Sequence, residues 1–429
     1  MEFRLQRTNL RINDTVTDKR AGKVVGKRKT RRVVFLGKKH SVMTASAPIR
    51  SLPEACDYML AQLRQHPDRD AVAAWEAAAA GRCRPYPVFG LGHLAAPTDT
   101  IPPPDDLVLP EVQMPATPEG DLAREVIGML DPLKMLNPIS ASFGLGKGPG
   151  TLVTCFGIPL NPEAMDAPAY SKTIDQVLAE PPPDPAIAGL MSTMHARIDF
   201  IKARTPEAFK IGLPDTQGPF NLAHSTVGME ALTAPYEEEE KFRALMERIT
   251  TFWLAALRNL RSWIGEARQM PHDRTGKICE CSVNLVSPDF YRQHILPHDC
   301  RIATALGPLH IHPCSGPHVF HATLDNLPVI VTEAGFIARA AAGAISVDEA
   351  LRALLDRPIL LHVGQELPEG REYEFICADF DRYAANPRQL FGYTGMHWRR
   401  KDRPMIREIH RRLDAYWTQR YGSCSRPGT

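Results

Sequence analysis

Two kinds of hydrophobic pattern alternate along the chain. Short apolar runs are typical of buried strands, and longer segments between them repeat apolar residues every three or four positions, as on the buried face of a helix. This alternation of strands and helices predicts a parallel sheet. The predicted strands are Thr151–Phe156, Phe209–Leu213, Cys279–Val286, Leu309–His312, Val329–Val331, Ile359–Val363, Tyr373–Cys377 and Leu390–Tyr393.

Helices are predicted where a capping residue precedes an amphipathic segment. Ser51-Leu-Pro-Glu54 and Ser346-Val-Asp-Glu349 match the capping box, in which two side chains satisfy N–H groups of the first helical turn. Ser287-Pro288 begins another helix, which should kink at Pro297 because proline lacks the N–H of a helical hydrogen bond. Further helices are predicted at Thr117–Leu130, Ile187–Ile201, Glu237–Ile264 and Met405–Tyr421.

The number of strand–helix units indicates the fold class. Eight units within about 300 residues favour a (β/α)₈ TIM barrel over an open doubly wound sheet, and no GxGxxG sequence follows the first strand. The glycine-rich segment Gly144–Gly150 lacks the Gly-Lys-Ser/Thr ending of a phosphate loop and is interpreted as a flexible loop. We therefore expect an α/β protein with a barrel at residues 141–422, an N-terminal helical extension at 43–140 and a disordered basic leader at 1–42.

Positive charge is concentrated in the leader. Residues 1–40 contain thirteen Lys and Arg and only three acidic residues, a net charge of +10 in a chain whose total is +2. Such a segment can bind nucleic acid or an anionic membrane surface, or can act as a targeting extension. It can equally be a disordered leader upstream of Met43, the interpretation we favour because a helix start closely follows that residue.

Composition limits the class of protein. No apolar run of about 18 residues is present, so no membrane span is expected. The N-terminus has no apolar segment typical of a secretory signal, and the nine cysteines include no CxxC pair. We predict a cytoplasmic protein with reduced thiols. Membrane and nucleic acid are not expected as partners, and a homodimer stays open.

The candidate chemistry is concentrated between Leu309 and Glu333. Four of the fifteen histidines and Cys314 lie between residues 310 and 321. Because alternate residues of a strand face the same way, His310, His312 and Cys314 can converge on one side. Polar residues also follow other predicted strands, and a barrel would collect them at one rim. These residues are Asp215, Glu333, His362, Asp379 and Tyr393.

Each candidate has a functional and an ordinary structural interpretation. His312 and Cys314 are the ligand types that zinc prefers, but they can also be a hydrogen-bonded histidine and a small buried thiol. Among the other candidate catalytic residues, Glu333 and His362 suit general acid–base catalysis, with a buried ion pair as the alternative. Asp215 can orient a substrate amine or pyrrole N–H, or can cap the following turn. Arg399, with Arg400 and Arg403, can bind carboxylates or can form a solvated surface.

Three segments occur in a distinctive order: Asp215-Thr-Gln-Gly-Pro-Phe220, Ser287-Pro-Asp-Phe-Tyr291 with Pro297, and Leu309-His-Ile-His-Pro-Cys-Ser-Gly316. Together they resemble segments of the uroporphyrinogen decarboxylase superfamily, which includes corrinoid-dependent methyltransferases acting on thiols. The resemblance extends over about residues 140–420 and implies a TIM barrel with a funnel open at the rim. The chain lacks the Arg-Gln-Ala-Gly-Arg-Tyr segment of the decarboxylases, and the loop Thr394–His397 lacks the cysteine that the methyltransferases use as a third zinc ligand.

The resemblance implies three functions. The first is a zinc-assisted methyltransferase acting on a thiol, with His312, Cys314 and Cys377 (or His397) as ligands and a corrinoid protein docking at the rim. The second is metal-free decarboxylation of a porphyrinogen, in which Asp215 stabilises the protonated pyrrole. The third is a non-catalytic barrel that binds a tetrapyrrole. The expected substrate-binding residues are Gln217, His310, Tyr393 and Arg399.

Overall fold

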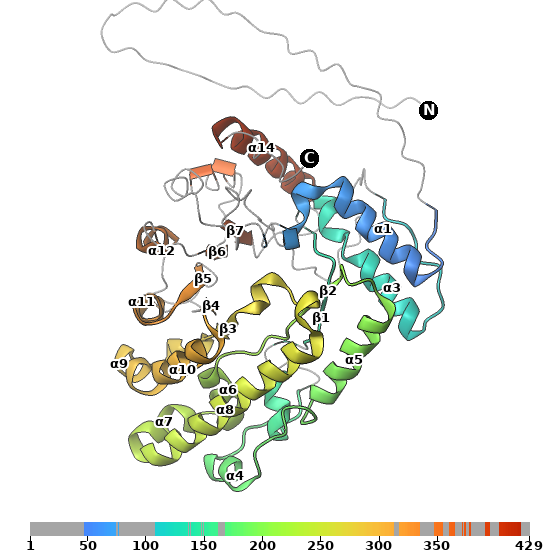
Figure 1. Ribbon diagram of the computed structural model, residues 1–429. Helices are drawn as coiled ribbons and strands as arrows, with labels where there is room; N and C mark the ends of the chain where they lie inside the picture. Colours follow the sequence, from blue (N-terminus) through green and yellow to red (C-terminus); the bar gives the residue numbers. More distant parts are fainter. Residues whose placement is uncertain are drawn as a thin grey trace, which may run out of the picture. The chain divides into compact units, whose positions relative to one another are not determined.

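The strands follow one another in chain order across two parallel sheets of the computed structural model (Figure 1). All described residues belong to one compact unit, Ala45–Thr429. The structure describes residues 47–73, 76, 108–135, 137, 139–146, 148, 150–161, 168–312, 317–334, 347–354, 360–364, 371, 373–374, 377–378, 391–394 and 403–421.

The smaller sheet pairs β1 (Ser142–Gly144) with β2 (Lys210–Gly212). The larger sheet contains five strands, each hydrogen-bonded to the next along the chain. They are β3 (Gly276–Cys279), β4 (Leu309–His312), β5 (Val329–Ala334), β6 (Leu360–Gly364) and β7 (Phe391–Thr394). Every pair is parallel, as the alternation of strands and helices predicted.

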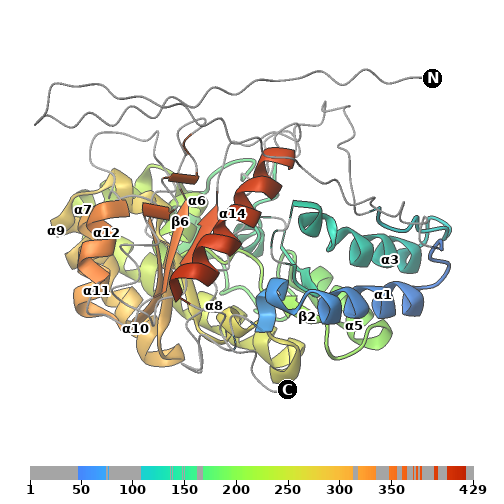
Figure 2. The same ribbon diagram turned by 90° about the horizontal axis from the view of Figure 1, so that it is seen from above.

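Helices connect the strands. The α-helices are α1 (Leu52–Gln65), α3 (Pro118–Gly128), α4 (Ile174–Ala179), α5 (Met191–Arg204), α6 (Pro219–Val227), α7 (Glu230–Glu237), α8 (Glu239–Ile264), α9 (Pro288–Phe290), α10 (Leu296–Leu306), α11 (Pro317–Asn326), α12 (Val347–Leu354) and α14 (Arg403–Tyr421). In both views α10, α11 and α12 lie along the same side of the larger sheet (Figures 1 and 2). The predicted helices at 117–130, 187–201, 237–264 and 405–421 are confirmed with shifts of a few residues at their ends.

Local chemistry explains where the helices begin. Ser51 Oγ accepts a hydrogen bond from Glu54 N at 3.4 Å, which is one half of the predicted capping box at the start of α1; Glu54 Oε2 accepts from Arg50 N at 2.8 Å instead of from Ser51 N. Ser287 caps α9 in the same way, through Phe290 N at 3.1 Å. The expected kink is a π-helical turn, Tyr291–Ile295, immediately before α10, where Pro297 occupies the first turn.

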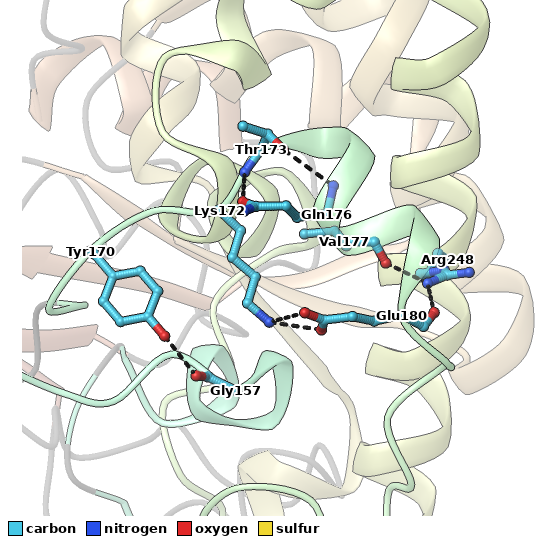
Figure 3. Close-up of polar contacts among 8 residues, drawn as sticks. All are labelled: Gly157, Tyr170, Lys172, Thr173, Gln176, Val177, Glu180 and Arg248. Atoms are coloured by element: carbon cyan, nitrogen blue, oxygen red, sulfur yellow. Dashed lines mark hydrogen bonds and ion pairs between the residues drawn. The ribbon is translucent and has the colours of Figure 1, made fainter.

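Segment α4 is fastened to the long helix α8 by a small polar cluster (Figure 3). Thr173 and Gln176 form a capping box at the start of α4. At the other end, Arg248 of α8 donates to the carbonyl oxygens of Val177 (2.5 Å) and Glu180 (2.6 Å), which are free carbonyls at the end of the helix. The Lys172 amine contacts the Glu180 carboxylate at 2.6 Å, so both ends of α4 are fixed.

Three predicted strands are wrong in whole or in part. Residues Leu152–Phe156 form a 3₁₀ helix, since a short apolar run does not by itself distinguish a strand from another buried segment. The strand predicted at Cys279–Val286 ends at Cys279, and a 3₁₀ helix, Cys281–Leu285, follows it. Tyr373 and Cys377 have a helical backbone, and Gly144, expected in a loop, is the last residue of β1.

The two sheets are joined close to the carboxyl ends of their strands. Gly218 N, in the loop after β2, donates to Cys279 O at the end of β3, at 2.9 Å. Leu213 N donates to Asp273 Oδ2 at 2.7 Å, which ties the same loop to the segment before β3. Closure into a barrel and the boundaries 1–42, 43–140 and 141–422 stay predictions. Within the described ranges no helix has the length and apolar character needed to cross a membrane.

Candidate functional site

A row of residues in register crosses the larger sheet, beginning at the carboxyl ends of β3 and β4 and continuing through the next-to-last residue of β5, the middle of β6 and the second residue of β7. Strand register pairs Cys279 with His312 and Glu333 with His362. It also pairs Ile311 with Thr332, so His312 and Glu333 are the next residues along their strands. His362 in turn pairs with Gly392 of β7. We call these five residues, Cys279, His312, Glu333, His362 and Gly392, the carboxyl-end row.

The side chains of β3 and β4 divide between two faces. A Cβ atom built on Gly276 would lie 2.7 Å from Leu309 Cδ2 and 3.1 Å from Leu306 Cδ1, so this position faces α10. Alternate residues point to opposite faces, and paired residues of a parallel sheet share a face. Lys277, Cys279, His310 and His312 therefore share the face directed away from α10. Cys279 and His310 are buried, with 4 % and 6 % exposure, whereas His312 at the strand end is half-buried.

The loop after β2, Asp215–Gly218, is the second part of the site, and we call it the rim loop. The half-buried Asp215 accepts a hydrogen bond from Gln217 N through Oδ1 at 3.1 Å. Gln217 has φ +54°, a left-handed conformation that is unfavourable for a residue with a side chain. Trp253 of α8 holds this conformation, because its indole N–H donates to the carbonyl oxygens of Thr216 (3.0 Å) and Gln217 (3.1 Å).

Side-chain hydrogen bonds connect the rim loop to the loop after β3. Ser282 N donates to Asn221 Oδ1 at 2.6 Å, and Asn221 Nδ2 donates to Gln217 Oε1 at 2.6 Å. Ser282 Oγ and His224 Nδ1 lie 2.9 Å apart. Burial lowers the pKa of His224 below its ordinary value of 6.5, so this imidazole is neutral at pH 7.

Three acidic groups are buried directly behind the rim loop. Glu280 and Asp299 are completely buried, and the Tyr291 hydroxyl donates to Asp299 Oδ2 at 2.9 Å. Burial raises the pKa of Glu280 well above its ordinary value, and the nearby Asp299 raises it further. Burial also raises the pKa of Asp299 to about 7, against the opposing effect of the Tyr291 hydrogen bond. At neutral pH this pair therefore retains at least one proton.

Glu280 also constrains the rim loop. A Cβ atom on Gly218 would lie 1.9 Å from Glu280 Oε1, so only glycine fits between this carboxyl group and α6.

The candidates named from the sequence differ in how much the structure describes. Asp215, Gln217, His310 and His312 are described with their side chains. The backbones of Glu333 and Tyr393 are next to last in β5 and β7, close to the strand ends as expected, whereas His362 is the middle residue of β6. Of Arg403 only the helical backbone is described. The candidates outside the described residues are Cys314, Asp379, His397, Arg399 and Arg400. Cys377 is buried in a helical segment rather than a strand, beside Tyr373, whose pKa is raised by burial and by this thiol. Its role as a metal ligand stays a prediction.

Two side chains of the site are of the types that bind zinc in proteins. His312 and Cys279 are neighbours in register on one face and provide a nitrogen and a sulfur donor, the ligand types that zinc prefers. Within the part of the chain that the structure describes, no group of three His, Cys, Asp or Glu side chains is arranged to hold a metal ion. Cys314, which follows His312 by two residues, is not among those residues.

Sequence reasoning missed Asn221, Ser282 and His224, and it also missed the buried Asp299 and Tyr291. The interacting atoms come from different loops and helices, so no local motif marks them. One signal was present in the sequence: Glu280 directly follows the apolar residues of β3, where a charged side chain is either buried or at a strand end.

Comparisons with known proteins give little further information. No protein-family model matches the chain, and no curated protein matches it either. Among solved structures the chain is similar to a methyltransferase from Methanosarcina mazei, with 14 % sequence identity and a TM-score of 0.46. The similarity covers 65 % of this chain and 81 % of that one. A TM-score below 0.5 does not establish a shared fold, so the residues themselves must support a function.

Proposed function

We propose that this chain is a zinc-assisted methyltransferase of the (β/α)₈ class that acts on a thiol substrate. The observation that carries the proposal is the carboxyl-end row, in which His312 and Glu333 are neighbouring positions and His362 is next. Active sites of parallel α/β proteins are formed at this end of the strands. The rim loop with Asp215 adjoins the same end, through the hydrogen bond between Gly218 N and Cys279 O.

The proposed ligands of zinc are His312 and Cys314, with Cys377 as the third ligand. Zinc, when bound, stabilises the deprotonated form of a thiol at neutral pH. The proposed base that accepts the thiol proton is Glu333 or His362, because both follow His312 in the carboxyl-end row. The thiolate sulfur forms a bond to the methyl carbon while the bond between that carbon and its donor breaks.

The other side chains bind and orient the substrate in this proposal. Asp215 and Gln217 do so from the rim loop, whose conformation Trp253 and Asn221 fix. His310, Tyr393 and Arg399 complete the proposed binding residues. The proposed methyl donor is a methyl-corrinoid carried by a partner protein that docks at the rim.

Metal analysis of the purified full-length protein tests this proposal. We expect about one zinc per chain, and loss of most of it in His312→Ala and in Cys314→Ser, because a site with three protein ligands does not tolerate loss of one. His321→Ala and Cys300→Ser are matched controls, since His321 pairs with Glu349 and Cys300 lies on α10. Wild-type protein without zinc, or equal zinc in all four variants, would refute the proposal.

Asp215 supports a second candidate function, the metal-free decarboxylation of a porphyrinogen. Its half-buried carboxylate in the loop after β2 would stabilise a protonated pyrrole in this class of reaction. Anaerobic turnover of uroporphyrinogen by zinc-free protein, abolished in Asp215→Asn, would favour this function over methyl transfer.

A further inference from the structure

The orientation of the Gln217 side-chain amide follows from a chain of hydrogen bonds that begins at a backbone N–H. A backbone N–H can only donate, so the Asn221 atom 2.6 Å from Ser282 N must be the amide oxygen. The other terminal atom of Asn221 is then its NH₂ group, which lies 2.6 Å from the terminal atom of Gln217. That Gln217 atom must therefore accept, and it is the amide oxygen.

The remaining group of Gln217 is an NH₂ donor at the rim. Its oxygen is used by Asn221, and no group in the described part of the chain accepts a hydrogen bond from Nε2. Gln217 is 92 % buried in a loop that Trp253 holds in a left-handed conformation, so the amide is not free to move into solvent. Nε2 is not among the buried polar atoms that lack a partner, so water reaches it; a ligand oxygen that replaces this water gains the net value of one hydrogen bond, about 0.5–1.5 kcal/mol.

We infer that Gln217 is a specificity-determining residue that donates a hydrogen bond to a carbonyl-type oxygen of the ligand. The inference rests on the proposed function in placing the ligand at the rim. It then specifies the substrate class as a thiol whose tail carries an acceptor oxygen rather than an amine. Asp215 adds a negative charge to the same loop, so a neutral carbonyl is favoured over a carboxylate.

Three small thiols differ in whether the tail donates or accepts hydrogen bonds and in the charge of the tail. Methyl 3-mercaptopropionate has a neutral tail that only accepts, 3-mercaptopropionate has an anionic tail that only accepts, and cysteamine has a cationic tail that only donates. Binding of each to the full-length protein is measured by isothermal titration calorimetry at neutral pH. We expect the ester to bind about tenfold more tightly than cysteamine, as one hydrogen bond predicts, with the carboxylate between them.

The substitution Asn221→Asp should reverse the orientation of the Gln217 amide, so that Gln217 presents an acceptor in place of a donor, without changing Gln217 itself. One oxygen of the new carboxylate still accepts from Ser282 N, and the other can only accept, so Gln217 must turn its NH₂ group inward and present its oxygen. We expect the ester to lose about tenfold in affinity and cysteamine to gain a similar factor. Asn284→Asp adds the same charge in the loop after β3, where Asn284 bonds only to Cys281 O, and should retain the ester preference.

The outcomes decide between the inference and its alternatives. Binding of no probe, equal binding of ester and cysteamine by the wild type, or equal changes in Asn221→Asp and Asn284→Asp would each overturn the inference. If circular dichroism shows Asn221→Asp unfolded, Gln217→Glu replaces the donor with a second oxygen and must also lose the ester preference. The zinc content of the same samples is measured as well. If the protein contains no zinc but prefers the ester, only the proposed metal chemistry is refuted. If the protein contains zinc but does not prefer the ester, only the inference about Gln217 is refuted.

Discussion

The buried pair of Glu280 and Asp299 makes the stability of this protein depend on pH. In the folded chain the pKa of Asp299 is about 7, compared with 3.8 for an ordinary aspartate. Between these values the folded state binds a proton that the unfolded state has released. Stability is therefore complete below about pH 4 for this group, falls as the pH rises through the window, and reaches its minimum above about pH 7.

Replacing Asp299 by Asn removes the charge and retains an oxygen that accepts from the Tyr291 hydroxyl. Since one pKa unit is worth about 1.4 kcal/mol, the ionisation of Asp299 lowers the free energy of unfolding by about 4 kcal/mol once it is complete. We expect the wild type to lose a large part of this amount between pH 5 and pH 8, and Asp299→Asn to lose less; the loss that remains comes from Glu280, which is still buried.

Urea unfolding at pH 5, 6, 7 and 8, followed by circular dichroism, measures this difference directly. Asp289→Asn is the control, because the Asp289 side chain is 90 % exposed and its charge is not desolvated. The expected result is a shallower pH dependence for Asp299→Asn than for both the wild type and the control. Parallel curves for all three proteins would refute the argument that burial holds a proton on this pair.

Three further changes follow from the same packing. Gly218→Ala should lower the free energy of unfolding by more than about 2 kcal/mol in urea titrations, because the added methyl group would overlap the Glu280 carboxyl group. Gly144→Ala is the control: its methyl group would meet nothing within 4 Å, so the free energy of unfolding should change by less than about 1 kcal/mol. Trp253→Phe leaves two rim-loop carbonyls without their indole donor and should cost about 1–3 kcal/mol in the same assay, a result contradicted by a wild-type midpoint. Burial lowers the pKa of His410 to about 3, so at pH values between about 3 and 6.5 only the unfolded chain binds a proton at this residue, and the free energy of unfolding falls as the pH is lowered. His410→Gln should make this fall shallower in urea titrations. An unchanged dependence of the free energy of unfolding on pH would argue against a neutral buried imidazole.

Local sequence signals predicted the helices and most of the strands. Ser51 and Ser287 each cap a helix through a hydrogen bond three residues ahead, so the information lies within one turn. The apolar run at 152–156 failed as a strand, because burial alone selects apolar residues whether the segment is extended or helical.

The positions of the candidate site were only partly predictable. Parallel strands in chain order bring their carboxyl ends together, so His312 and His362 could be placed near each other before their register was known. The bond between Asn221 and Ser282 joins residues 61 positions apart, and the contact of Tyr291 with Asp299 depends on a π-helical turn. Such contacts depend on tertiary packing, which periodicity and capping rules do not describe.

The arrangement of the carboxyl-end row has a consequence for how this protein can change. Every member comes from a different strand, while neighbouring positions such as Ile278 and Ile311 supply the apolar layer beneath the helices. A substitution in this row therefore alters the proposed site and leaves the supporting layer intact. Evolution or protein engineering can therefore exchange the side chains of this row one at a time. Such exchanges can change the chemistry of the site without disturbing the residues on which folding depends.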